Sequence, residues 1–243
     1  MLRNPVMGEF MGTFIMMVLG NGVVAACVLK RTKAEGSGWL AITTGWAFAV
    51  LCGIFAGNLF GSPDAFLNPA IAIAFAIKLG DFSHVVPFVA AEVAGAFLGA
   101  VSVWLFYLPH WAVTESQDDK RGSFCTGPAI RSFGSNFFCE IFATFVLVLV
   151  VGAIGSKLVL SAGPAPGVSP FLVGCLVWSV GLSLGATTGY AINPARDFGP
   201  RLAHALLPIA GKGYSDWSYA WIPVAGPIIG ASLAAFVLRA LGA

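Results

Sequence analysis

The sequence predicts an all-α membrane protein with six transmembrane helices and two re-entrant half-helices in two inverted repeats. Hydrophobic residues make up 58% of the 243 residues, charged residues make up 10%, and the mean hydropathy is +0.86. This composition is typical of a chain embedded in lipid. The tripeptide Asn-Pro-Ala occurs twice, at 68–70 and 193–195. A net charge of +2 without a basic cluster gives no indication of nucleic-acid binding.

The first half of the chain holds three segments that are long enough to cross a hydrocarbon core, which needs about 20 helical residues. They are 6–29, 40–60 and 85–107, and the first and third each carry one charged residue, Glu9 and Glu92. The apolar segment 69–77 lies between the second and third. Its length reaches only about half of the membrane at about 1.5 Å per residue, so it must enter and return on the same side.

The second half repeats this order. Its predicted transmembrane segments are 135–155, with Glu140 as the one charged residue, 170–192 and 219–238. A second short segment, 198–207, follows Asn193. The polar stretch 109–131 joins the two halves and is the longest predicted connection outside the membrane.

Each Asn-Pro pair is a helix-start signal, because Asn caps helices well and Pro suits the first helical position. A helix that starts inside a membrane has unpaired N–H groups and a positive dipole end, which must face a cavity instead of lipid. Asn68 and Asn193 are therefore predicted to meet near the midplane of a pore or solute site.

The two halves also match in residues. Glu9-Phe10-Met11-Gly12-Thr13-Phe14 and Glu140-Ile141-Phe142-Ala143-Thr144-Phe145 share the pattern Glu-x-x-small-Thr-Phe. Three spans per repeat is an odd number, so the second repeat enters the membrane from the opposite side. We expect one transmembrane channel domain, 1–243, with inverted repeats at about 1–108 and 132–243.

The run Asn193-Pro194-Ala195-Arg196-Asp197-Phe198-Gly199-Pro200 resembles the aquaglyceroporin, or glycerol facilitator, branch of the aquaporin superfamily (major intrinsic protein). The resemblance covers essentially the whole chain. It implies an aquaporin-like fold, a homotetramer in the cell membrane with cytoplasmic termini, and passive conduction of glycerol, similar polyols and some water, without protons or ions. Val28-Leu29-Lys30 and Gly36-Ser37-Gly38 are similar to a bacterial subgroup that passes lactic acid.

The resemblance also suggests which residues select the solute. A filter of Arg196, Tyr190, Gly181 and Thr44 follows from counting along the motifs, with Trp46 as the alternative to Thr44. Thr44 at that position would make a wider and more polar constriction than a Trp.

Three acidic residues are expected to hold the pore loops. By resemblance, Glu9 and Glu140 accept hydrogen bonds from the irregular segments before Asn68 and Asn193, because buried carboxylates need donors. Asp197 is expected to hold its loop and not to touch solute.

A secondary active transporter of a small organic acid is the alternative function, because inverted repeats and broken helices also characterise such carriers. A carrier usually needs an ion-coupling acid near the midplane. Asp64 and Asp197 are the only acids close to the Asn-Pro-Ala copies, and both have loop explanations. No nucleophile, phosphate loop or metal cluster is recognised, so no enzyme activity, cofactor or metal is expected.

The predicted orientation conflicts with the distribution of basic residues. Cytoplasmic loops usually hold the excess of Lys and Arg. With cytoplasmic termini, the inner side holds Arg3, Lys78, Lys157 and Arg239, and the outer side holds Lys30, Arg31, Lys33, Lys120, Arg121, Arg131 and Lys212. We keep the cytoplasmic termini because the resemblance places the filter Arg at the outer vestibule.

Overall fold

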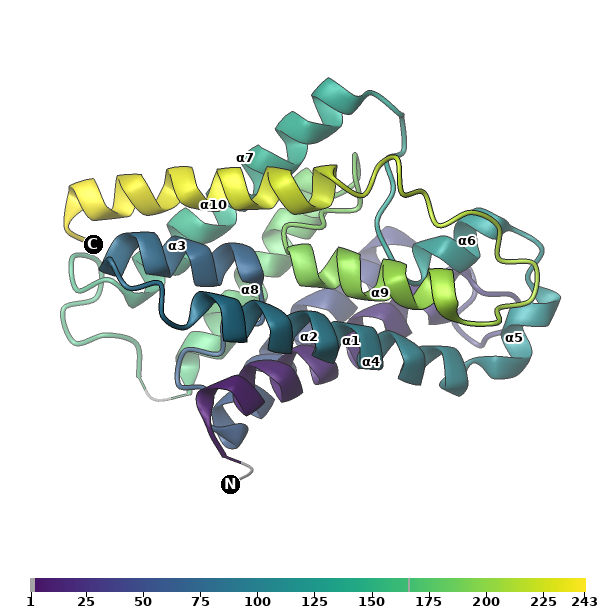
Figure 1. Ribbon diagram of the computed structural model, residues 1–243, viewed down its shortest axis with the longest axis horizontal. Coiled ribbons are helices and arrows are strands. Elements are labelled where there is room, and N and C mark those ends of the chain that lie inside the picture. The colour runs from purple at the N-terminus through teal and green to yellow at the C-terminus, as the bar shows by residue number, and fades with distance from the viewer. Residues whose placement is uncertain (1–2, 166) are drawn as a thin grey trace.

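The computed structural model describes residues 3–165 and 167–243, and every regular element in this part of the chain is a helix (Figure 1). The helices are α1 (Pro5–Val28), α2 (Gly38–Phe60), α3 (Pro69–Leu79), α4 (Val85–Phe106), α5 (Leu108–Val113), α6 (Gln117–Gly122), α7 (Phe133–Gly155), α8 (Val168–Leu184), α9 (Pro194–Leu206) and α10 (Ile222–Leu241). Residues 1, 2 and 166 of the predicted domain lie outside the described residues. The predicted all-α membrane fold is confirmed.

Five of the described helices, α1, α2, α4, α7 and α10, are long and apolar enough to cross a membrane. α8 has 17 residues and is shorter, but it occupies the place of the predicted fifth span. α3 and α9 are the two half-helices, with 11 and 13 residues.

The half-helices begin where the Asn-Pro signals predict. The Asn68 side chain accepts a hydrogen bond from Ala70 N at 2.9 Å, and the Asn193 side chain accepts from Ala195 N at 3.0 Å and Arg196 N at 3.2 Å. Both Asn residues have extended backbone and are followed by Pro, so each chain turns directly into the helix.

The helices pack in the same way in both halves of the chain. α1 packs against α2 and α4, and α7 packs against α8 and α10. The halves meet through α2 with α8, α3 with α10, and α4 with α9. Figure 1 shows α3 and α9 following one another along the long axis of the molecule, with their N-terminal ends facing.

Glycine permits the closest helix contacts, because small residues let transmembrane helices approach each other closely. A Cβ atom added to Gly95 of α4 would overlap the carbonyl oxygen of Phe10 in α1, and one added to Gly230 of α10 would overlap that of Ile141 in α7. Equivalent helix pairs in the two repeats are therefore held at backbone contact by equivalent glycines.

One prediction about elements was wrong. The segment 170–192 is not one helix, because α8 ends at Leu184 and residues 185–192 form the loop before Asn193, with positive φ at Tyr190 (36°) and Ile192 (43°). The connection 109–131 contains most of α5 and all of α6. Lys120 of α6 donates to the carbonyl of Ala210, which ties this connection to the segment after α9.

Candidate solute pore

The two Asn-Pro-Ala segments meet through their asparagine side chains. Asn68 Nδ2 donates to Ile192 O at 2.8 Å, and Asn193 Nδ2 donates to Leu67 O at 2.7 Å. Each amide therefore bonds to the carbonyl that precedes the other asparagine, which fixes both side chains. Because an amide NH₂ group carries two hydrogens, each asparagine keeps a second donor. Both residues line the same cavity and are buried in the protein.

This cavity has a volume of about 290 Å³ and extends along the half-helix junction. Trp46, Tyr190 and Arg196 line it on one side of the asparagines, and Asp64, Gly155 and Ser169 line it on the other. The remaining wall consists mainly of aliphatic side chains, including Val50, Leu147 and Val177. The cavity thus joins polar groups at its ends and centre with an apolar wall between them.

Arg196 and Trp46 face each other closely at the first of these ends. The guanidinium carbon lies 4.3 Å from the Trp46 ring centroid, a distance at which cation–π attraction is significant. Arg196 Nη1 and the Tyr190 hydroxyl have no hydrogen-bond partner within residues 3–165 and 167–243. Arg196 is 7% exposed and Tyr190 is 4% exposed, so these polar atoms depend on the cavity for partners.

The prediction that Thr44 lies opposite Arg196 is wrong. The Thr44 hydroxyl donates to Leu40 O, one turn earlier in α2, at 2.7 Å, and Thr44 does not line the cavity. Trp46, the alternative, occupies that place. The error came from the length of the loop between α2 and Asn68, which the sequence alone could not align.

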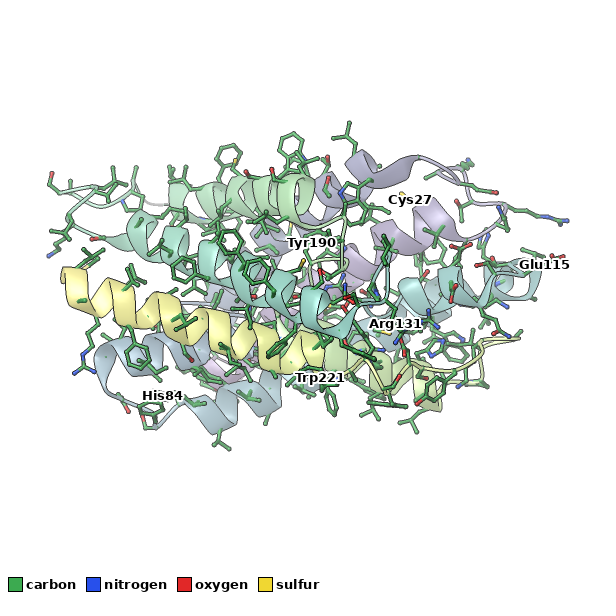
Figure 2. The ribbon with its side chains drawn as sticks, turned by 90° about the horizontal axis from the view of Figure 1, so that it is seen from above. Cys27, His84, Glu115, Arg131, Tyr190 and Trp221 are labelled. Atoms are coloured by element: carbon green, nitrogen blue, oxygen red, sulfur yellow. The ribbon has the colours of Figure 1, made fainter. Side chains whose placement is uncertain are left out.

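Gly181 lies behind Tyr190 and is not part of the cavity lining. A Cβ atom at Gly181 would lie 3.0 Å from Tyr190 Cζ, so the glycine leaves room for the phenol ring. Trp39 Nε1 donates to Gly181 O at 3.1 Å, and the Trp39 ring meets the Tyr190 ring edge-on, with centroids 5.7 Å apart. Figure 2 shows Tyr190 near the middle of the molecule, among the helices. Trp39 was missed by sequence analysis because nothing in its surroundings marks it.

Two buried glutamates hold the loops that precede the asparagines. Glu9 accepts hydrogen bonds from Ser62 Oγ, Phe66 N and Leu67 N, at 2.6, 3.0 and 2.7 Å. Glu140 accepts from Thr188 Oγ1, Ala191 N and Ile192 N, at 2.7, 3.0 and 2.9 Å. Each carboxylate binds one hydroxyl and two consecutive backbone amides, so the two loops are fixed by equivalent sets of donors.

Comparison with known proteins identifies the family of the chain. Residues 2–238 match the family model described as major intrinsic protein. The chain belongs to the major intrinsic protein family. It is 52% identical over 232 residues to a probable glycerol uptake facilitator protein of Thermotoga maritima, covering 94% of this chain and 95% of the relative. It is 41% identical over 242 residues to a D/L-lactic acid transporter of Lactiplantibacillus plantarum, covering 97% of each.

The same fold occurs in the X-ray structure of the aquaglyceroporin from Plasmodium falciparum. The TM-score is 0.83 at 24% sequence identity, over 97% of this chain and 94% of that one. Membership of the major intrinsic protein family makes this chain a multi-pass membrane channel and not an enzyme. In the described part of the chain, no group of three or more His, Cys, Asp or Glu residues is placed to hold a metal ion.

Glu92 of α4 is a third buried acid at the pore of this major intrinsic protein, and sequence analysis gave it no role. Its Oε1 accepts from Asn68 N at 2.9 Å, so Glu9 and Glu92 together bind three consecutive amides, 66–68. Glu92 Oε2 has no hydrogen-bond partner in the described residues. The place of Glu92 in the second repeat, three residues before Gly230, the glycine equivalent to Gly95, is taken by Pro227. The repeat therefore gave no indication of its role.

Asp197 is buried and bonded to other segments of the chain, and sequence analysis did not foresee these partners. It forms an ion pair with Arg201, with Oδ1 2.8 Å from Nε, and accepts from Thr126 N and Oγ1 at 2.8 and 2.6 Å. Arg201 also donates to Thr126 O and to the carbonyls of Ser215 and Asp216. Both charges are fully buried, and apart from each other their partners lie on two further chain segments, at Thr126 and at Ser215 and Asp216. This network fixes α9 and therefore also Arg196, which directly precedes Asp197 in that helix.

Proposed function

We propose that this protein is a passive channel for small uncharged solutes, namely glycerol and similar polyols, neutral lactic acid and some water, and that it excludes protons and ions. The observation that carries the proposal is the cavity that joins Arg196 and Tyr190 to the paired asparagine amides along an aliphatic wall. The glycerol facilitator and lactic acid transporter relatives support the same solutes.

A polyol has a hydroxyl-bearing side and a carbon backbone, and the cavity offers a matching surface for each. Arg196 and the second hydrogens of Asn68 and Asn193 would donate to hydroxyl oxygens. The Trp46 ring and aliphatic side chains such as Val177 would contact the carbon backbone. A solute that loses water on entry regains hydrogen bonds at the donors, so its desolvation cost falls.

The electrostatic and desolvation contributions differ for charged solutes. The N-terminal ends of α3 and α9 point toward each other at the asparagines, so two positive dipole ends meet there. Together with Arg196, they would disfavour protons and other cations at the centre. An anion would be attracted there, but the apolar wall cannot replace its hydration. Neutral solutes avoid both penalties.

The finer features of the channel belong to the same proposal. We infer one channel domain with inverted repeats at about 1–108 and 132–243, a homotetramer in the cell membrane, and cytoplasmic termini. The many exposed Leu, Phe and Val side chains on the transmembrane helices fit a surface covered by lipid and neighbouring subunits.

Flux measurements at two pH values test the solute class. In proteoliposomes, glycerol flux should hardly change with pH, whereas lactic acid flux should rise about tenfold for each unit by which the medium is acidified, because only the neutral acid crosses. Protein-free vesicles, measured in parallel, give the flux through lipid alone. Lactic acid flux that tracks the carboxylate concentration, or no glycerol flux above the protein-free control, would contradict the proposal.

A further inference from the structure

Asp64 gives the pore a fixed negative charge at the end opposite to Arg196. Among the described residues that line the cavity, Asp64 and Arg196 are the two that are charged. They lie toward opposite ends of the cavity, because Arg196 faces Trp46 in the first half of α2, whereas Asp64 follows the C-terminal end of that helix. Gly155, the last residue of α7, and Ser169, in the first turn of α8, line the cavity as well.

The backbone around Asp64 is fixed on both sides. Asn58 Nδ2 donates to Pro63 O at 3.3 Å, and Ala65 N donates to Ser62 Oγ at 3.0 Å. Ser62 is itself buried and donates to Glu9 at 2.6 Å. Because these bonds hold residues before and after Asp64, its carboxylate stays at the mouth of the cavity while remaining exposed to solvent.

Within the described residues, no basic side chain forms an ion pair with this carboxylate. Asp64 takes part in none of the ion pairs and hydrogen bonds of residues 3–165 and 167–243. Arg3 packs beside Gly61 in the same region but forms no ion pair with Asp64. An unpaired charge at a water-filled mouth with low-dielectric walls focuses its field on the entering solute.

We propose that Asp64 is a charge-selectivity determinant of this mouth, which repels small organic carboxylates and other anions while leaving neutral polyols unaffected. Without it, the positive field of Arg196 and of the two helix ends would draw anions into the vestibule, where they would block neutral solutes. The inference rests on the proposed glycerol conduction, because glycerol flux is its readout.

The test compares two permanently charged blockers of opposite sign, methanesulfonate and tetramethylammonium, present at equal concentration on both sides of the vesicle. Glycerol flux is measured in low salt for the wild type, Asp64→Asn and Asp64→Lys, each relative to its own flux without blocker. One unit charge at about 6 Å in water changes local ion concentration about threefold. Asp64→Asn should therefore be about three times more sensitive to methanesulfonate and about three times less sensitive to tetramethylammonium, and Asp64→Lys should shift further.

Asp81→Asn is the matched control, because Asp81 is an exposed acid in the loop after α3 that does not line the cavity. It should behave like the wild type. The differences should also disappear at about 1 M salt, where the Debye length is about 3 Å. Equal blocker sensitivity of wild type and Asp64→Asn, or an equal shift in Asp81→Asn, would overturn the inference while leaving glycerol conduction intact. A wild type without glycerol flux would refute the proposed function and this inference with it.

Discussion

Replacing Glu140 by Leu should release the loop that carries Tyr190 and abolish most of the solute flux. The substitution removes the acceptor of three buried donors, Thr188 Oγ1, Ala191 N and Ile192 N. A buried donor left without a partner costs about 1–3 kcal/mol, so the three together cost about 3–9 kcal/mol before the loop relaxes. This is a large share of a typical unfolding free energy of about 5–15 kcal/mol.

Glu140→Gln should be much milder. One carboxylate oxygen accepts from both Thr188 and Ala191, and the other accepts from Ile192. A glutamine can keep its single oxygen on the first pair and then loses only the bond to Ile192, at a cost of about 1–3 kcal/mol. The order of stability should be wild type, then Gln, then Leu.

The assay combines two measurements. Thermal unfolding in detergent is monitored by size-exclusion chromatography, and glycerol flux is measured by stopped flow in proteoliposomes. Glu115→Leu serves as the control, because Glu115 is an exposed acid at the edge of the molecule (Figure 2). It should keep wild-type stability and flux. Wild-type stability and flux in Glu140→Leu would refute the bracing role, as would equal losses in Glu140→Leu and Glu115→Leu.

Three further predictions test the filter, the third buried acid and the ion pair between Arg131 and Asp216. Thr44→Val should leave glycerol flux unchanged. Trp46→Ala removes one wall of the constriction and should increase the swelling rate of vesicles in a five-carbon polyol severalfold. A larger effect of Thr44→Val than of Trp46→Ala would contradict the assignment of Trp46. Glu92→Gln keeps an oxygen for Asn68 N and should unfold near the wild-type temperature, whereas Glu92→Leu should lose about 1–3 kcal/mol, and equal unfolding temperatures would count against this role. Burial alone would raise the pKa of Asp216, but hydrogen bonds from Arg131 outweigh it and lower that pKa in the folded protein. The ionised Asp216 therefore stabilises the fold above its ordinary pKa of about 4, and this stabilisation is lost as the pH falls through the lower pKa of the folded state. Thermal unfolding of Asp216→Asn should accordingly depend less on acid pH than that of the wild type, and identical pH profiles would argue against the ion pair.

The sequence predicted the features that follow from local chemistry and periodicity. Apolar segments of about 20 residues gave most of the transmembrane helices, and Asn-Pro gave the start of both half-helices at Asn68 and Asn193. The end of α8 was missed because residues 185–192 carry no charge and contain no proline, so nothing in them interrupted the predicted span. Their conformation depends on hydrogen bonds to Glu140, which lies far away in the chain.

The two loop-bracing glutamates were predictable because both repeats carry the same residue there. Glu9 and Glu140 occupy equivalent places, so each supported the interpretation of the other. Glu92 and Asp64 have no such counterpart, and the side of α2 that faces the cavity depends on a loop whose length cannot be read from spacing alone. Thr44 was chosen over Trp46 for that reason, although the two lie only two positions apart on the helix.

Simultaneous measurement of glycerol flux and proton current tests the central claim most directly. Proteoliposomes that contain a pH-sensitive dye are given a glycerol gradient, then a proton gradient, and finally both in opposite directions. A passive channel built on the Asn68 and Asn193 amides should pass glycerol down its gradient at the same rate in the presence and absence of the proton gradient, with no change in internal pH beyond that of protein-free vesicles. Glycerol or lactic acid accumulation against its gradient, driven by protons, or a proton current comparable to the solute flux would contradict the account.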